Sequence, residues 1–187
     1  MFLVVFAALS LISVPLAGGR LSKLADLHLR WAPAIFSSLV IQVVIVSLVP
    51  GGNPWLHRVL HLASYLLAAA FLVVNRRVPG LVVIALGALA NAVAIFANDG
   101  VMPASARALR AAGQLTSTKG FINSGVLAHP RVAFLGDIFA IPKPVPFHNV
   151  FSIGDLCIAV GIAVAVHTLC GSRLARRRVR EGVLTPG

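Results

Sequence analysis

Charged residues are scarce in this chain of 187 residues, and acidic residues are the scarcest, with five Asp and Glu in total. Only 11% of the residues are charged, whereas soluble domains usually carry about a quarter. Hydrophobic residues make up 58% of the chain, and the mean hydropathy is +0.93. A soluble core of this size cannot hide so much apolar surface, so we expect the lipid bilayer to be the solvent.

Cysteine and the common catalytic motifs are also scarce. The two cysteines, Cys157 and Cys170, fall in one predicted helix. A rise of about 1.5 Å per residue places them roughly 20 Å apart, which is too far for a disulfide between them. The sequence contains no P-loop, GxSxG, CxxC or Rossmann fingerprint. No motif therefore indicates a cofactor, and we expect none.

Positive charge is present in excess, with a formal net charge of +11. Such a charge can indicate nucleic-acid binding, but its distribution argues against that partner. Five of the sixteen Lys and Arg lie in the last fifteen residues, and the others lie in loops between apolar runs. Basic residues in short loops set the orientation of membrane proteins. We therefore predict no nucleic-acid partner, an outer N-terminus and a cytoplasmic C-terminus.

Five apolar runs predict an all-α integral membrane protein with five transmembrane helices. A loop of about fifty residues, 98–149, is expected to pack over the outer ends of the helices, between the fourth and the fifth. The first run lacks the basic start and the cleavage site of a signal peptide, so it is expected to be retained. Residues 1–171 then form one transmembrane domain, and residues 172–187 form a disordered basic tail. The runs cover about 1–16, 32–49, 59–74, 81–97 and 150–169.

Two carboxylates are the main candidates for chemistry: Asp137 in LGDIFAIP and Asp155 in FSIGDLCIAVG. If they converge, they form a catalytic dyad that shares a proton and hydrolyses a peptide bond. A structural interpretation is also open, in which Ser152 and Asp155 form a capping box at the start of the last helix and Asp137 lies in an ordinary turn.

A metal site is a third possibility, in which the two acids join histidines. The HExxH motif is absent, so this signal is weak, and no metal is predicted. The histidines considered are His57, His61, His129 and His148.

Several short motifs resemble a domain-of-unknown-function family of small prokaryotic membrane proteins. The motifs are NDGVMP at 98–103, NS at 123–124, LGD at 135–137 followed by Pro142, and FSIGD at 151–155. This sequence has Asp99 where that family often has Gly. The resemblance implies a location in the plasma membrane of a prokaryote and brings no activity. The motif residues that we expect to bind a ligand or partner are Asn98, Asp99, Asn123, Ser124 and Ser152.

The last helix also resembles, over about twenty-five residues, the lipoprotein signal peptidases, which are membrane aspartic proteases. The segment FSIGDLCI followed by Gly161 is similar to their FNxADxxI motif, and Asp137 precedes Asp155 by a similar interval. The resemblance implies that both aspartates are catalytic. Ser152 replaces the Asn of that motif, and the family's GNxxDR motif has no counterpart beyond Gly87 to Asn91.

The resulting functional expectation has two forms. The first is a non-catalytic membrane component that binds a membrane protein or lipid partner through the outer loop. The second is an aspartic peptidase-like enzyme that uses Asp137 and Asp155 at the outer face. The bilayer is the expected environment in both.

Overall fold

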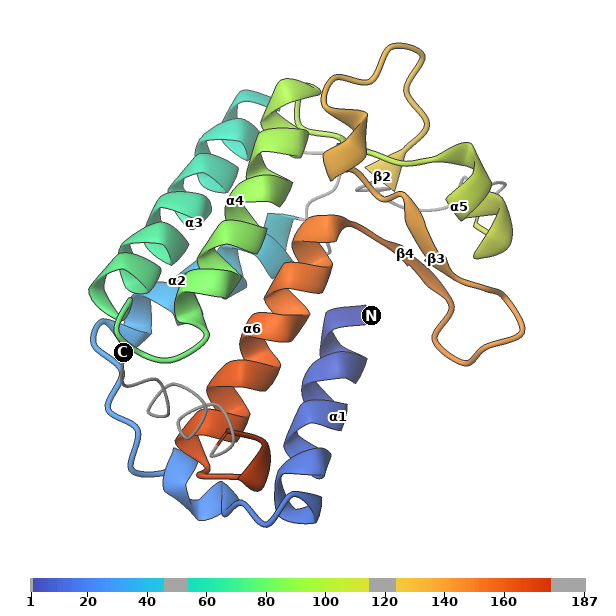
Figure 1. Ribbon diagram of the computed structural model, residues 1–187. Helices are drawn as coiled ribbons and strands as arrows, with labels where there is room; N and C mark the ends of the chain where they lie inside the picture. The colour runs from blue at the N-terminus through green and yellow to red at the C-terminus, as the bar shows by residue number, and fades with distance from the viewer. Residues whose placement is uncertain (1, 46–53, 115–123, 176–187) are drawn as a thin grey trace, which may run out of the picture.

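The computed structural model describes residues 2–45, 54–114 and 124–175, and five long helices form most of it (Figure 1). The apolar runs of the sequence form these helices. Gly80, with a positive φ of 84°, is the N-cap residue that precedes α4. A short 3-10 helix, η1 (Leu21–Leu24), follows the first of them. The long helices are α1 (Phe2–Leu16), α2 (Ala32–Val43), α3 (Pro54–Val74), α4 (Leu81–Ala97) and α6 (Ile153–Leu169).

The expectation of five transmembrane helices is wrong for this structure. Four of the long helices have only 12 to 17 residues, which is about 18–26 Å at 1.5 Å per residue. The hydrocarbon core of a bilayer is about 30 Å thick. Within the described residues, α3 also fails to supply a crossing segment, so none of the helices combines the necessary length and apolar character.

Residues 98–149, which we expected to be a packed loop of an all-α protein, contain strands as well as short helices. We call the described residues of 98–151 the cap, because they cover one end of the helices (Figure 1). The chain is therefore mostly helical but not all-α. The cap elements are β1 (Met102–Pro103), α5 (Ala106–Ala111), β2 (Ser124–Gly125), η3 (Ala133–Leu135), β3 (Phe139–Ile141) and β4 (Asn149–Phe151).

Two small sheets organise the cap. Strands β1 and β2 pair in parallel, with Met102 opposite Ser124. Strands β3 and β4 pair antiparallel, with Ala140 opposite Val150. An isolated parallel bridge joins Ala104 to Asp137 and links the two sheets through the backbone. Ser124 and Asp137 therefore lie on two segments whose backbones pair with the same stretch of chain, 102–105.

The cap has a small apolar core of its own. Helix α5 starts at Ser105, whose side chain accepts a hydrogen bond from the backbone N–H of Ala108. The same helix packs against β3 and β4. Its buried residues meet Val150 of β4, so the cap is a folded layer rather than a linker. The buried members of this core are Ala104, Ala108, Leu109, Ala112 and Val150.

Helices α4 and α6 run antiparallel and make the most extensive helix contact (Figure 1). Gly87 faces Gly154: a Cβ on Gly87 would lie 2.5 Å from the Gly154 carbonyl oxygen. Two turns further down, Gly161 faces Gly80 in the same way, at 2.8 Å from its carbonyl oxygen. Gly87 and Gly161 therefore allow close helix packing, because any side chain there would push the helices apart.

Helix α1 lies along α6 and brings its N-terminal end to the cap. Phe2 stacks on Phe151 of β4, with ring centroids 4.3 Å apart. At the other end, the Ser13 hydroxyl donates to the Ser10 carbonyl, so its contact with His167 Nε2 at 3.0 Å is donated by the histidine. Contacts at both ends therefore fix α1 against the rest of the molecule.

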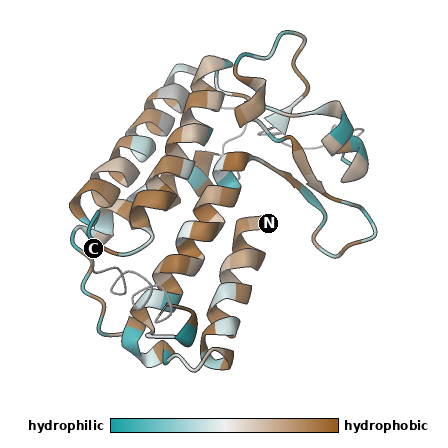
Figure 2. Ribbon diagram, in the orientation of Figure 1, coloured by the Kyte–Doolittle hydropathy of each residue, from teal (hydrophilic) through white to brown (hydrophobic). Residues whose placement is uncertain are grey.

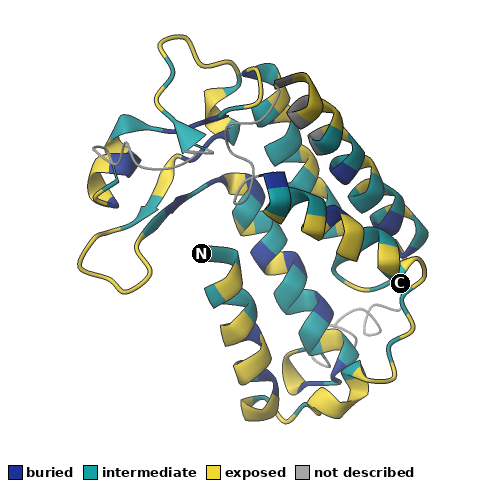
Figure 3. Cartoon of the chain, turned by 180° about the vertical axis from the view of Figure 1, so that it is seen from behind, coloured by how far each residue is buried: buried dark blue, intermediate teal, exposed yellow. Residues whose placement is uncertain are grey.

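Apolar side chains remain on the outside of the helices. Figure 2 shows hydrophobic residues along the long helices and hydrophilic residues mainly at the turns and in the cap. From behind, exposed residues follow the outer helix faces in Figure 3. Val4, Leu66 and Leu86 are 60–67% exposed. The apolar side chains that give the sequence its high hydropathy therefore lie on the surface as well as in the core. Most of the predicted tail, residues 176–187, lies outside the described residues.

Candidate active site

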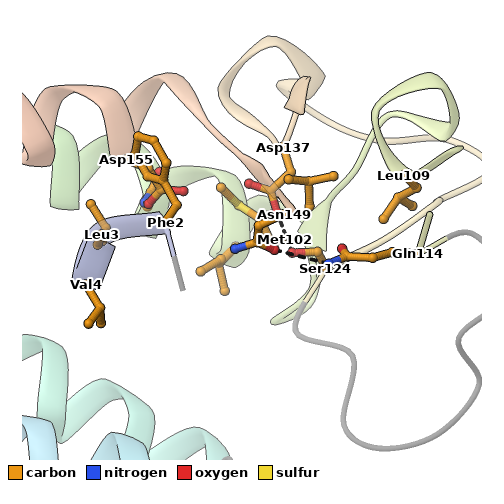
Figure 4. Close-up of a pocket in the computed structure, with 13 residues that line it drawn as sticks. Phe2, Leu3, Val4, Met102, Leu109, Gln114, Ser124, Asp137, Asn149 and Asp155 are labelled. Carbon is orange, nitrogen blue, oxygen red and sulfur yellow. Dashed lines mark hydrogen bonds between the residues drawn. The ribbon is translucent and has the colours of Figure 1, made fainter. Parts of the chain in front are cut away.

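A pocket of about 460 Å³ lies where α1, α4 and α6 meet the cap (Figure 4). Both Asp137 and Asp155 line it, one from the cap and the other from α6. The first turn of α1 supplies an apolar wall. The remaining lining residues are Phe2, Leu3, Val4, Asn91, Ile95, Met102, Leu109, Gln114, Ser124, Asn149 and Val150.

Asp155 is positioned by the capping box that the sequence predicts. Its backbone N–H donates to Ser152 Oγ at 2.9 Å, and its Oδ2 accepts from the backbone N–H of Ser152 at 3.1 Å. The carboxylate also lies at the positive end of the α6 dipole. The structural interpretation of this pair is thus confirmed, and the side chain nevertheless remains half-buried at the pocket wall.

Asn91 of α4 joins the capping box from the neighbouring helix. Its Nδ2 donates to Asp155 Oδ1 at 2.8 Å, and its Oδ1 accepts from the Ser152 hydroxyl at 2.7 Å. Ser152 is fully buried, and its hydroxyl is satisfied as donor and as acceptor. Such a closed network of hydrogen bonds holds the Asp155 carboxylate in one orientation. A carboxylate has about four acceptor sites, so it can still accept from a water or substrate.

Asp137 has a different environment on the cap side. Its residue is 5% exposed, and its carboxylate accepts a hydrogen bond from the Ser124 hydroxyl. Its backbone is fixed because its N–H donates to the Pro103 carbonyl at 2.8 Å and its carbonyl accepts from the Ser105 N–H at 3.0 Å. Burial raises the pKa of Asp137 to about 6; the Ser124 hydrogen bond opposes this shift, and the charge of Asp155 adds to it.

The two carboxylates therefore have unequal roles available to them. Asp155 accepts a hydrogen bond on each oxygen, from Asn91 and from the backbone N–H of Ser152. With its pKa near 6, Asp137 is partly protonated at mildly acidic pH and can donate a proton. The two carboxyl groups of the pocket thus differ in burial and in their hydrogen-bond partners.

Two further polar residues of the pocket were not predicted. Gln114 follows α5 and Asn149 begins β4, and the Gln114 side chain donates to Asn149 Oδ1 at 3.4 Å. Figure 4 shows the pair beside Ser124 and Asp137. Asn149 lies next to the FSIGD motif, which is the signal that would have singled it out. Gln114 has no such signal, because only the folding of the cap brings it to the pocket.

The remaining predicted binding residues do not gather at this pocket. Asn98 is buried at the end of α4, where its Nδ2 donates to Arg131 O at 2.9 Å and its Oδ1 accepts from Arg131 N at 2.8 Å. It therefore fastens the cap to α4. Asp99 is exposed and has a positive φ of 55° in the turn after α4. Asn123 lies outside the described residues.

Metal ligation has no geometric support in the described ranges. No three described side chains of His, Cys, Asp or Glu are grouped as a metal site requires, and the side chains of His57 and His61 lie outside the described part of the structure. His148 is exposed in the turn before β4, and His129 is exposed beyond β2.

Comparisons with known proteins identify a family but no activity. Residues 26–167 match the model of a family of unknown function, DUF5317. This range includes both aspartates and every polar residue of the pocket. No curated protein and no solved structure matches the chain. The resemblance to a domain-of-unknown-function family is confirmed, and the local resemblance to lipoprotein signal peptidases stays a prediction.

Proposed function

The chain belongs to this family of unknown function, and we propose that it is a hydrolase that cleaves peptide bonds by acid–base catalysis with Asp137 and Asp155. The observation that carries the proposal is that one pocket is lined by both carboxylates, which come from separate layers of the fold. Their environments differ, and the charge of Asp155 contributes to the raised pKa of Asp137. A carboxyl pair coupled in this way is typical of water activation without a covalent intermediate.

In the proposed reaction, Asp155 is the general base and Asp137 the general acid. The Asp155 carboxylate takes a proton from water, and the water oxygen bonds to the carbonyl carbon while Asp137 protonates the carbonyl oxygen. The tetrahedral intermediate returns that proton to Asp137 as the C=O bond reforms. The C–N bond breaks, and the nitrogen takes the proton held by Asp155. The products are a carboxylic acid and an amine, and both aspartates regain their starting states.

A cleavage assay with purified protein tests this proposal. The protein is incubated with a mixed peptide library at pH 5 and at pH 8, and new termini are identified by mass spectrometry. Asp137→Asn and Asp155→Asn should each lower cleavage by about two to four orders of magnitude. Asp99→Asn is the matched control, because that carboxylate is exposed outside the pocket, and it should retain activity. Wild-type levels of cleavage in both pocket variants, or no cleavage by the wild type, would contradict the proposal.

A non-catalytic role remains as a second candidate, favoured by apolar side chains on the outside of the cap. Phe134 is 67% exposed and Phe147 is 57% exposed. Large exposed apolar residues of this kind are typical of surfaces that bind another protein or lipid. In this role, the double variant Phe134→Ser with Phe147→Ser fails to complement a deletion of the gene, whereas the two Asp→Asn variants complement it as the wild type does.

We also propose that the protein works at the plasma membrane of a prokaryote. The exposed leucine and valine side chains on α1, α3 and α4 support contact with lipid. Cell fractionation tests the location: the protein should sediment with the membrane fraction, and its recovery in the soluble fraction would contradict it. The orientation of the termini stays a prediction.

A further inference from the structure

An apolar groove between α3 and α4 is separate from the pocket of the aspartates. Its volume is about 470 Å³, and Arg76, just beyond the end of α3, is its charged lining residue. The two helices lie side by side (Figure 1) but make far fewer contacts than α4 and α6 do. Five alanines leave space between the helices: Ala68, Ala69, Ala85, Ala88 and Ala92.

The two ends of the groove differ chemically. Near the cap, Tyr65 of α3 and Phe96 of α4 meet edge to face, with ring centroids 5.5 Å apart. At the opposite end, the exposed Arg76 donates from Nη1 to the Val73 carbonyl at 3.2 Å, which holds its guanidinium beside the groove. Arg77 is exposed next to it. The groove is therefore bridged by aromatic rings at one end and cationic at the other.

A third arginine is attached to the cationic end by a specific clamp. Asn75 Oδ1 accepts from the backbone N–H of Arg30 at 2.9 Å, and Asn75 Nδ2 donates to the Arg30 carbonyl at 2.7 Å. The clamp brings the exposed Arg30 to the end of α3, although it lies far away in sequence. Arg76, Arg77 and the backbone of Arg30 thus lie together just beyond α3, and Arg76 lines the groove.

We propose that this groove binds one acyl chain of an anionic phospholipid, with the phosphate headgroup at Arg76 and Arg77. The groove extends from Leu62 to Arg76, which is about 21 Å of helix at 1.5 Å per residue. One leaflet of a bilayer core is about 15 Å thick, so the groove can take the length of an acyl chain. Arginine binds phosphate oxygens through paired N–H donors. A phospholipid with a net negative charge is favoured over a zwitterionic one, because the headgroup cation of a zwitterionic lipid is repelled by the arginines.

Native mass spectrometry of the full chain in detergent tests the proposal with two probes of identical acyl chains, phosphatidylglycerol and phosphatidylcholine. Wild type should retain phosphatidylglycerol preferentially. Arg76→Gln with Arg77→Gln should weaken that retention about fivefold per charge removed, because one basic residue near an anionic lipid surface contributes about that factor. Ala69→Phe fills the groove from an exposed position and should reduce the retention of both lipids.

Matched controls separate these effects from general changes in charge or packing. Arg107→Gln with Arg110→Gln removes two exposed charges from α5, and Ala8→Phe adds a ring to an exposed site on α1. Both controls should bind lipid as the wild type does. Equal retention of the two lipids, no effect of Ala69→Phe, or a second copy of the chain in place of lipid would overturn the proposal. The outcome is independent of Asp137 and Asp155.

Discussion

At the scale of single residues, Asp137 links the stability of the fold to pH. Its pKa is raised from 3.8 to about 6, because burial disfavours the charged form. Between these two values the folded chain binds more protons at this residue than the unfolded chain does. The contribution of the carboxyl to stability is fully present below pH 3.8 and is lost as the pH rises through about 6.

Replacement of this carboxyl should therefore stabilise the protein. Asp137→Asn removes the charge and keeps an oxygen that can accept from Ser124. We expect the free energy of unfolding at pH 7 to rise by at most about 3 kcal/mol, which is the equivalent of the pKa shift. The measurement is denaturant unfolding at pH 4 and pH 7. An equal effect at both pH values would show that the gain does not come from ionisation.

Ser124 should tune the same equilibrium. Its hydroxyl donates to the Asp137 carboxylate and lowers the pKa of that group against the effect of burial. Ser124→Ala should consequently raise the pKa of Asp137 above about 6. Activity that requires the protonated Asp137 should then extend to higher pH. Titration of the carboxyl by carbon NMR measures the shift directly. A lower pKa in the variant would mean that the hydroxyl does not stabilise the charged form.

At the scale of elements, the start of α6 depends on one buried hydroxyl. Ser152→Ala removes the capping hydrogen bond at the start of α6 and leaves Asn91 Oδ1 without its donor. Loss of a cap costs about 1 kcal/mol, and an unsatisfied buried acceptor adds about 1–3 kcal/mol. Ser105→Ala is the matched comparison at the start of α5, where the capping hydrogen bond is 3.5 Å long. Chemical denaturation should rank Ser152→Ala as clearly the more damaging change, and equal losses would contradict the network.

The contact of α4 with α6 depends on glycine. A Cβ on Gly154 would collide with the Asn91 side chain and lie 2.6 Å from the Gly87 carbonyl oxygen. Gly154→Ala should therefore separate the helices, break the Asn91–Asp155 hydrogen bond and lower the melting temperature by several degrees. At Gly125 an added Cβ meets only a Val101 methyl group at 3.6 Å. Gly125→Ala should melt like the wild type, and a similar loss in both variants would argue against specific packing.

At the scale of the whole molecule, two asparagines fasten opposite ends by the same geometry. Asn98 grips the backbone of Arg131 and holds the cap on α4. Asn75 grips the backbone of Arg30 at the far end of α3. Each side chain replaces a strand-like pair of backbone hydrogen bonds between segments that are distant in sequence.

Replacement of these asparagines should loosen only the end that each one holds. Asn98→Ala should raise amide hydrogen exchange around 131–137 and disturb Asp137, whereas Asn75→Ala should raise exchange around 26–31 and leave the pocket unchanged. Hydrogen exchange followed by mass spectrometry compares the two variants on one chain. Faster exchange at both ends in either variant would show that the molecule opens as one unit.

The positions of the long helices follow closely from local sequence. Apolar runs and the flanking Gly80 predict α4 at 81–97, and the S-x-x-D spacing predicts the capping box of α6. The last helix begins at Ile153 and not at about residue 150 as predicted, because Val150 and Phe151 pair with β3. Strands of two or three residues carry no periodic signal, and a partner strand decides whether they form.

The sequence by itself determined the apolar character of the chain, the helices and the capping box that contains Asp155. It could not determine whether those helices reach the length of a bilayer, since apolar runs do not specify where hydrogen bonding ends. Only the tertiary structure brought Asn91, Ser124 and Asp137 to the pocket of Asp155. The reason is physical. The capping hydrogen bonds at the start of α6 form between residues three apart in sequence, whereas a pocket requires contacts between residues distant in sequence. Those contacts depend on how the glycine-lined helices and the small sheets pack.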